Sequence, residues 1–152
     1  MKVRSVQPSD AKQLMELGIQ FHKESPFHSR YKFDKDKSFD FMKYLALSEK
    51  SCMYACEKDG DIITGFVGGQ LRSMYYTHDV YASEAIFYVK PEFRGGRTAI
   101  LLLRKFEEWA KNNKAKDVEL GVVTSIDPEK ADRFFKKSGY NYMGANFYKE
   151  IM

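Results

Sequence analysis

One stretch constrains the fold of this chain more than any other: Glu84 to Arg104, which reads EAIFYVKPEFRGGRTAILLLR. It opens with β-branched and aromatic residues typical of a strand, breaks at Pro91, turns through Gly95-Gly96 and resumes with helical spacing. The first N–H groups of a helix have no partner inside it, and glycine lets a ligand approach the backbone. The stretch therefore predicts either an anion site or an ordinary strand-to-helix connection.

The residues after the turn predict a parallel strand–helix–strand unit. The helix has one apolar face, made of Ala99, Leu102, Leu103, Phe106 and Ala110. It ends near Asn112-Asn113, and residues Asp117 to Val123 form a buried strand, parallel to the one before the helix because a helical crossover joins them. A last helix runs from Asp127-Pro128 to Gly139, and Tyr140 to Met143 and Asn146 to Met152 are expected to complete the sheet.

The middle of the chain predicts antiparallel pairing. Three segments have strand-like composition: Ser51 to Glu57, Ile62 to Arg72 and Tyr81 to Val89. Asp59-Gly60 between the first two is a strong hairpin signal. The glycines of the second segment, Gly65, Gly68 and Gly69, predict a bulge or the close approach of another group.

The N-terminal part predicts a short strand and two helices. Lys2 to Val6 alternates as a strand, and Pro8-Ser9-Asp10 opens a helix that we expect to fray near Gly18. Residues 21 to 37 are predicted to form a long loop, after which helical spacing resumes at Phe39. A loop of this length in a compact domain is usually functional.

Length and composition favour one globular domain over residues 1–152. The order of the predicted strands and helices favours an α/β (α+β) architecture around a mixed sheet. No apolar signal segment or membrane-spanning run is present, so a cytoplasmic protein is expected. Cys52 and Cys56 lie on one strand face roughly 13 Å apart, too far for a disulfide. His22, His28 and His78 lack metal-ligand spacing, so no metal is assigned.

Several motifs carry a resemblance to a known family. Val89 to Ala99, VKPEFRGGRTA, resembles the acetyl-CoA signature V-x-P-E-[YF]-R-G-x-G-x-[GA] of the GCN5-related N-acetyltransferases, abbreviated GNAT. Arg97 departs from it where the family most often has glycine. Leu120-Gly121-Val122 and the run from Asp127 to Tyr140 extend the similarity over most of the chain.

The resemblance implies a GNAT-type fold, with an antiparallel N-terminal half and a parallel βαβ unit that binds CoA. It implies acetyl transfer from acetyl-CoA to a primary amine by direct transfer in a ternary complex; a homodimer is compatible with it. Cofactor-binding positions carried over fall into two groups. Backbone groups for pantetheine come from Phe87, Tyr88 and Val89, and the diphosphate is held by Arg94, Gly95, Gly96, Arg97, Thr98 and Ala99.

The sequence offers a candidate for the general base but none for the general acid. Glu84 lies where some family members carry a glutamate that deprotonates the amine, and Ala82, Ala85 and Ile86 around it predict partial burial; a solvated or ion-paired glutamate is the other interpretation. The tyrosine that usually protonates the thiolate is replaced by Phe135. Tyr140, Tyr142 and Tyr148 are substitutes by sequence position, so no general acid is assigned.

The acceptor side is predicted from the long loop. Phe27, Tyr31 and Phe33 are expected to form a wall of the acceptor site, as the segment between the first two helices does in the family; a surface loop with a secondary aromatic cluster is the alternative. Four acidic residues could attract a cationic amine or balance nearby lysines: Glu24, Asp34, Asp36 and Asp79.

A second function class is a binding module without turnover, for CoA, nucleic acid or protein. Basic residues interspersed with aromatic ones between His22 and Tyr44 motivate the nucleic-acid version. A single Arg-Gly-Gly, the lack of an RNP-type aromatic motif and a pI near 8.9 argue against it, whereas the net charge of +4 does not choose between CoA and nucleic acid.

Overall fold

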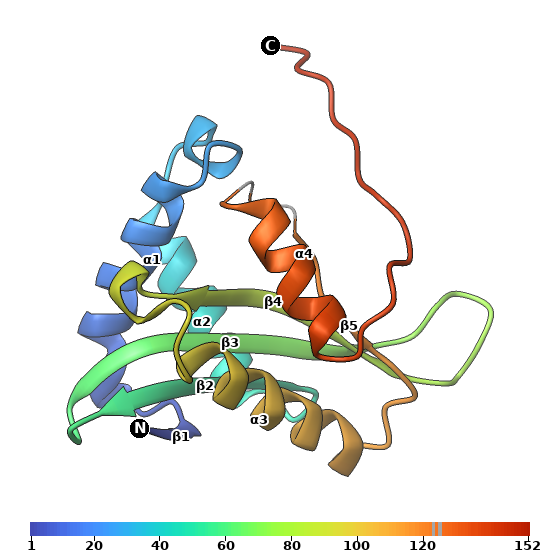
Figure 1. Cartoon of the computed structure of the whole chain (residues 1–152), viewed down its shortest axis with the longest axis horizontal. Coiled ribbons are helices and arrows are strands. Elements are labelled where there is room, and N and C mark those ends of the chain that lie inside the picture. Colours follow the sequence, from blue (N-terminus) through green and yellow to red (C-terminus); the bar gives the residue numbers. More distant parts are fainter. Residues whose placement is uncertain (123, 125) are drawn as a thin grey trace.

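The computed structural model describes residues 1–122, 124 and 126–152, and these residues include a five-stranded sheet with the order β1-β2-β3-β4-β5. The strands are β1 (Lys2–Ser5), β2 (Ser51–Lys58), β3 (Ile62–Arg72), β4 (Tyr81–Val89) and β5 (Val118–Glu119). Neighbours from β1 to β4 are antiparallel, and β4 and β5 are parallel. The predicted mixed sheet with an antiparallel first half is confirmed (Figure 1).

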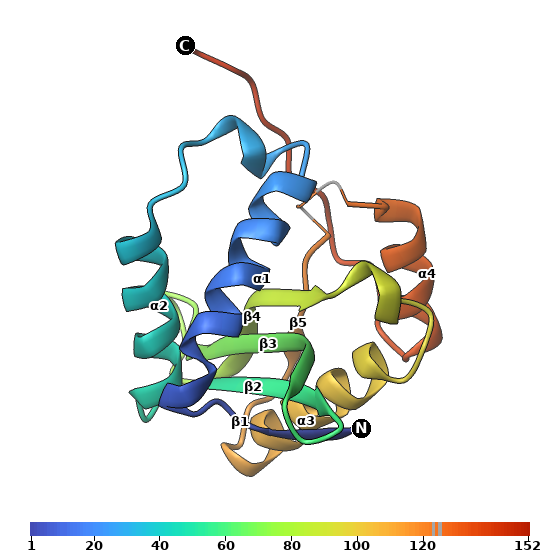
Figure 2. The same cartoon turned by 90° about the vertical axis from the view of Figure 1, so that its left-hand side faces the viewer.

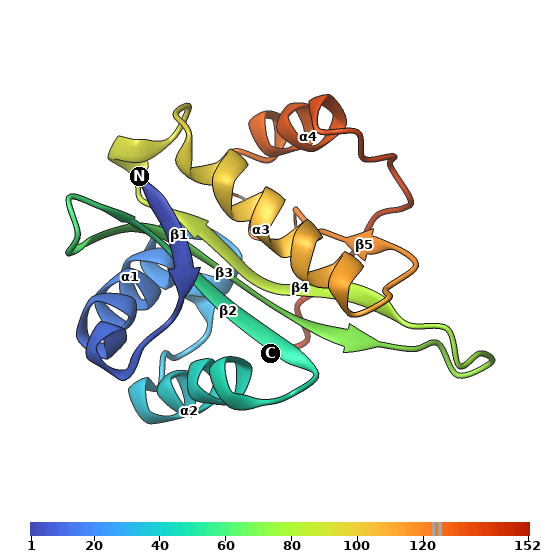
Figure 3. The same cartoon turned by 90° about the horizontal axis from the view of Figure 1, so that it is seen from below.

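Among the described residues, four α-helices lie on the two sides of the sheet: α1 (Ala11–Glu24), α2 (Lys35–Leu47), α3 (Thr98–Asn112) and α4 (Pro128–Lys137). Figure 3 shows α1 and α2 on one face and α3 and α4 on the other. The described residues also form three short 3-10 helices: η1 (Pro8–Asp10) directly before α1, η2 (His28–Arg30) between α1 and α2, and η3 (Pro91–Phe93) between β4 and α3.

Each face of the sheet has its own apolar core. Leu14 and Leu17 of α1 and Met42 and Leu45 of α2 pack on one face, around buried Phe66. Leu102, Phe106 and Ala110 of α3 pack on the other, where Cys52 and Cys56 lie as buried, free thiols. Alternation along β2 and β3 supplies apolar side chains to both faces, which fixes the pairing register.

The N-terminal helices are longer than expected. Helix α1 continues through Gly18 to Glu24, so the predicted fraying and the loop start at residue 21 are wrong. Gly18 is buried, and a Cβ there would lie 3.2 Å from the Met42 methyl group, so this glycine allows α1 and α2 to pack closely. Helix α2 starts at Lys35, where the Asp34 carboxylate accepts a hydrogen bond from the Lys37 N–H.

The last part of the sheet differs most from expectation. The strand predicted over Asp117 to Val123 is formed only at Val118–Glu119, and Val123 lies outside the described residues. Helix α4 begins as predicted, with the Asp127 side chain accepting from the Lys130 N–H. The final strands are wrong: residues 141–152 have no strand assignment and run as an extended, exposed segment, drawn in red in Figure 1.

The glycines of β3 mark an irregular junction with β4. Gly68 faces Ile86 and Gly69 faces Glu84, so β4 carries one extra residue, Ala85, at this point. A Cβ on Gly69 would lie 2.4 Å from the Phe106 ring. Both expectations for these glycines, a bulge and a close approach, are therefore met.

Candidate active site

Strand β4 has an open edge. Its parallel pairing with β5 is limited to Ala82 with Val118 and Ser83 with Glu119. From Glu84 to Val89, β4 has no strand partner on this side among the described residues. Figure 2 shows the chain after β5 running away from the direction of β4, so the two segments diverge beyond their short pairing; we call the space between them the gap.

The pairing of β4 with β3 decides which backbone groups of β4 face this gap. The Lys90 N–H donates to the Thr64 carbonyl on β3 at 2.9 Å. Because successive residues of a strand direct their backbone groups to opposite sides, Tyr88 also faces β3, whereas Phe87 and Val89 face the gap. Of the three residues predicted to hold pantetheine, Phe87 and Val89 are therefore the ones with outward backbone groups.

The glycine turn leads directly from this edge into α3. Gly95 has a φ of 78°, which glycine adopts without strain. The first helical bond runs from the Leu101 N–H to the Arg97 carbonyl, so the N–H groups of Thr98, Ala99 and Ile100 point out of the helix N-terminus. These groups and the positive end of α3 form a site suited to a phosphate.

The two ends of the turn are anchored to different elements. After the turn, the buried Thr98 hydroxyl hydrogen-bonds the Thr64 hydroxyl of β3 at 3.0 Å. Before the turn, the Arg94 guanidinium forms a bidentate ion pair with Glu24 of α1, and its Nε donates to the Val89 carbonyl at 2.9 Å. Arg97, in contrast, is exposed.

Glu84 lies at the start of the open edge. Its side chain is partly buried and accepts a hydrogen bond from the Gly121 N–H at 3.3 Å, across the gap between β4 and the chain after β5. Burial raises the pKa of Glu84 to about 7, against the opposing effect of that hydrogen bond. A carboxylate with this pKa can accept a proton from an amine near neutral pH.

The candidates for a general acid are separated from one another. Phe135 contacts Tyr140, whose hydroxyl donates to Glu107 at 2.7 Å; burial and this bond raise the pKa of Tyr140. Tyr142 is exposed, and Tyr148 packs against Phe27, with ring centroids 4.8 Å apart. The general acid therefore stays unassigned.

The predicted acceptor wall is an aromatic cluster on η2. The Arg30 guanidinium lies over the rings of Phe27, Tyr31 and Tyr148, at 4.7, 5.4 and 4.5 Å from their centroids. Arg30 also pairs with Glu150 at 2.9 Å, which holds the C-terminal segment against η2. Phe33 lies apart from this cluster and contacts His22.

This cluster is connected to the gap by Ser25. The buried Ser25 hydroxyl donates to the carbonyl of Thr124, in the segment that follows β5. It also accepts from the His28 N–H at 3.0 Å, at the start of η2. One side chain thus joins the predicted acceptor wall to the far side of the open edge.

The predicted acidic residues already have partners in most cases. Glu24 binds Arg94, Asp34 caps α2, and Asp79 lies 3.6 Å from Lys116. Asp79 thus pairs with a lysine, as the second interpretation predicted, whereas Glu24 pairs with an arginine and Asp34 caps a helix. These pairings leave Glu84 as the carboxylate that faces the gap.

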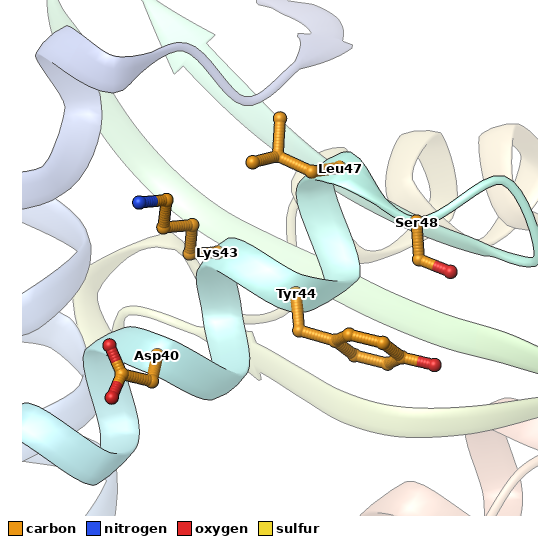
Figure 4. Close-up of a pocket in the computed structure, with 5 residues that line it drawn as sticks. All are labelled: Asp40, Lys43, Tyr44, Leu47 and Ser48. Atoms are coloured by element: carbon orange, nitrogen blue, oxygen red, sulfur yellow. The ribbon is translucent and has the colours of Figure 1, made fainter.

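A surface hollow on α2 lies outside this arrangement. It has a volume of about 430 Å³ and is lined by Asp40, Lys43, Tyr44, Leu47 and Ser48. Figure 4 shows these side chains leaving one helical segment in different directions, so they do not converge on a ligand. We assign no chemistry to this hollow.

Comparison with protein families decides the identity of the domain. The model of the acetyltransferase (GNAT) domain matches residues 49–142, which is more than half of the chain. The chain belongs to the GNAT acetyltransferase family. The match includes the open edge of β4, the glycine turn and α3, so these are GNAT elements. A search among proteins of curated function found no match.

Solved structures share the GNAT fold over the full chain. The aminoglycoside antibiotic 6'-N-acetyltransferase AAC(6')-IG from Acinetobacter haemolyticus has a TM-score of 0.72 and 16% identity, covering 100% of both chains. AAC(6')-Iy in complex with a bisubstrate analogue, CoA-S-monomethyl-acetylneamine, has a TM-score of 0.78 and 16% identity, covering 99% and 98%. A mutant of the BH1408 protein from Bacillus halodurans has a TM-score of 0.82 and 15% identity, covering 100% of both.

Sequence reasoning missed the partners that organise the GNAT site. The sequence predicts that Glu24 either attracts the acceptor or balances nearby lysines, but Glu24 binds the arginine of the glycine turn, 70 residues later. Arg30 was not singled out, although it holds the aromatic cluster together. The signal available for Arg30 was its position between Phe27 and Tyr31, which favours cation–π contacts.

Proposed function

We propose that this protein transfers the acetyl group of acetyl-CoA to a primary amine by direct transfer in a ternary complex. The observation that carries the proposal is the open edge of β4, which starts at Glu84 and leads to the glycine turn and the N-terminus of α3. Pantetheine lies along the edge, bound by the backbone of Phe87 and Val89. The diphosphate lies at the turn, bound by backbone N–H groups between Gly95 and Ala99 and by the charge of Arg97.

Glu84 removes the proton of the acceptor ammonium group in this proposal. Its raised pKa of about 7 lets it exist partly as a base and hold the proton after transfer. The neutral amine then attacks the thioester carbonyl, the C–S bond breaks and CoA leaves as a thiolate. The proton that the attacking nitrogen loses as the amide forms is taken up by this thiolate, directly or through water. Such a thiolate is a good leaving group because a free thiol has a pKa of about 8.5.

The acceptor approaches from the η2 side. The aromatic cluster of Phe27, Tyr31 and Tyr148 already binds one cation, the Arg30 guanidinium, so its rings suit a cationic amine. Small amines, including aminoglycosides, and protein amines are the classes to test.

The same proposal includes a homodimer in a reducing compartment such as the cytoplasm. The apolar C-terminal segment is an exposed surface that a second copy can cover. Cys52 and Cys56 are free, buried thiols, as expected in such a compartment. Among the described residues, no helix has the length and apolar character needed to cross a membrane.

The experiment combines binding with turnover. Calorimetry should show that acetyl-CoA and CoA compete for one site, and thiol release in the presence of an amine panel should show transfer. Gly96→Val should weaken acetyl-CoA binding by blocking the backbone, whereas Gly96→Ala should weaken it less. A Cβ at Gly96 meets only the Phe93 carbonyl oxygen, at 3.5 Å, so both variants should fold.

Each alternative has its own outcome. Binding of acetyl-CoA without transfer to any amine would favour the CoA-binding module. Unchanged acetyl-CoA affinity in folded Gly96→Val would show that the diphosphate does not lie at this turn. Binding of an oligonucleotide in place of CoA would favour the nucleic-acid module.

A further inference from the structure

The arginine of the glycine turn is engaged inside the protein. The Arg94 N–H donates to the Pro91 carbonyl at 3.2 Å, and the Arg94 Nε donates to the Val89 carbonyl at 2.9 Å. Both outer nitrogens of the guanidinium donate to the Glu24 carboxylate. The charge of Arg94 is thus paired before any anion arrives at the turn.

A tyrosine of β4 completes this network. The Tyr88 hydroxyl donates to Glu24 at 2.7 Å, and the Arg94 guanidinium lies 5.3 Å from the Tyr88 ring centroid. The Phe21 ring of α1 stacks on the Tyr88 ring, with the two ring centroids 4.8 Å apart.

We infer that Glu24 and Arg94 are positioning residues for the diphosphate-binding turn. The Arg94 side chain joins α1, the end of β4 and the turn, so it fixes where the N–H groups after Gly95 point. The Thr98 and Thr64 hydroxyls anchor the other end of the turn to β3. Arg97, which is exposed and has no ion pair among the described residues, is the side chain that meets the diphosphate charge.

This inference rests on the proposed function, because it assigns roles at the acetyl-CoA site. The alternative is that Glu24 only holds Arg94 until the diphosphate displaces it. The two cases predict opposite changes in CoA affinity when Glu24 is replaced. If Glu24 positions the turn, its removal weakens CoA binding; if Glu24 competes with the diphosphate for Arg94, its removal strengthens CoA binding.

The experiment measures CoA dissociation constants by calorimetry for Glu24→Gln, Arg94→Gln and the double variant. Each single change should weaken binding about tenfold, the order expected for a hydrogen bond to a charged group. The double variant should be no weaker than either single one, since both changes remove the same connection. Glutamine keeps the size of Glu24 and can still accept from Tyr88, so the fold should persist.

Arg97→Gln is the matched control. It should also weaken CoA binding, but its effect should add to that of Glu24→Gln and should lower the salt dependence of binding, because a charge facing the anion is lost. The salt dependence should stay unchanged in Glu24→Gln. Pantetheine, which lacks the diphosphate, should bind the parent and Glu24→Gln equally in an NMR titration.

The failures are distinguishable. A parent protein that does not bind CoA would overturn the proposed function. Tighter CoA binding in Glu24→Gln, or a lower salt dependence in Arg94→Gln, would make Arg94 a direct diphosphate ligand and overturn the inference alone. Equal losses for CoA and pantetheine in Glu24→Gln would reduce its role to general stability.

Discussion

Glu84 shows how a single side chain can favour chemistry at the expense of stability. Its pKa in the folded protein is about 7, whereas a carboxyl of this kind ordinarily titrates near 4.5. The folded state therefore holds the proton more tightly than the unfolded state between these values. Stability falls as the pH rises through this window, because the charged form is poorly accommodated at its partly buried site.

We predict that Glu84→Gln separates these two effects. At pH 8 the variant should unfold at a higher temperature than the parent, and the difference should shrink towards pH 4.5. Acetyl transfer should fall by roughly 10²–10⁴-fold, as for other lost acid–base groups. Thermal unfolding at both pH values and kcat/KM measure the two effects.

Glu16→Gln, a change at an exposed residue of α1, is the control and should alter neither quantity. Equal turnover in Glu84→Gln would remove Glu84 from the mechanism. A variant less stable than the parent at pH 8 would contradict the raised pKa.

For single residues, the sequence predicts the environment correctly where the contacting groups are close in the sequence. Partial burial of Glu84 follows from its apolar neighbours in the same strand, and the Asp127 cap follows from the proline after it. The partner of Glu24 lies 70 residues away and depends on how α1 lies beside the turn. No pattern near Glu24 contains that information.

Helix α3 packs closely on the sheet because a glycine of β3 leaves room for a large side chain of the helix. Gly69 lies where β4 bulges, and the Phe106 ring of α3 occupies the space that a side chain would need. The absence of a side chain at Gly69 therefore sets how closely α3 approaches the sheet. That approach in turn fixes the N-terminus of α3 relative to β4.

We predict that Gly69→Ala destabilises the protein by about 2–3 kcal/mol, because the added methyl group would lie 2.4 Å from the Phe106 ring. Chemical denaturation measures the free energy of unfolding. Gly96→Ala is the matched control and should change this free energy little, since its methyl group is uncrowded. A similar loss in both variants would mean that the contact with Phe106 is not the cause.

Which elements could be predicted depends on how much of their stability is local. The hairpin of β2 and β3 has its own turn signal and alternation, and its predicted boundaries agree with the structure within a residue. Strand β5 and the residues after α4 have strand-like composition but need a partner strand. Their pairing depends on tertiary contacts, so composition alone predicted more strand than the structure contains.

At the scale of the whole molecule, the C-terminal segment is the least covered part. It carries exposed apolar side chains: Tyr142, Met143, Phe147, Tyr148, Ile151 and Met152. It is held against η2 by Glu150 and Tyr148. Single exposed apolar residues are normal, but a continuous run of this kind indicates an interaction surface.

We predict that the protein forms dimers through this segment. Sedimentation equilibrium should show a concentration-dependent dimer for the parent and a monomer for the double variant Phe147→Lys/Ile151→Lys. The control Asn141→Lys/Asn146→Lys adds the same charge at exposed polar positions and should remain dimeric. A monomeric parent, or dimers in all three proteins, would contradict this role of the segment.

The open edge of β4 has a consequence for the protein without its ligand. Unpaired N–H and C=O groups along a strand are a template on which another polypeptide can add, which is how edge strands start aggregation. The bulge at Ala85 and the hydrogen bond from the Gly121 N–H to the Glu84 side chain shield the beginning of this edge, and the Arg94 Nε occupies the Val89 carbonyl at its end. A cofactor bound along Phe87 and Val89 would occupy the remainder, so the molecule that supplies the acetyl group would also protect the fold from self-association.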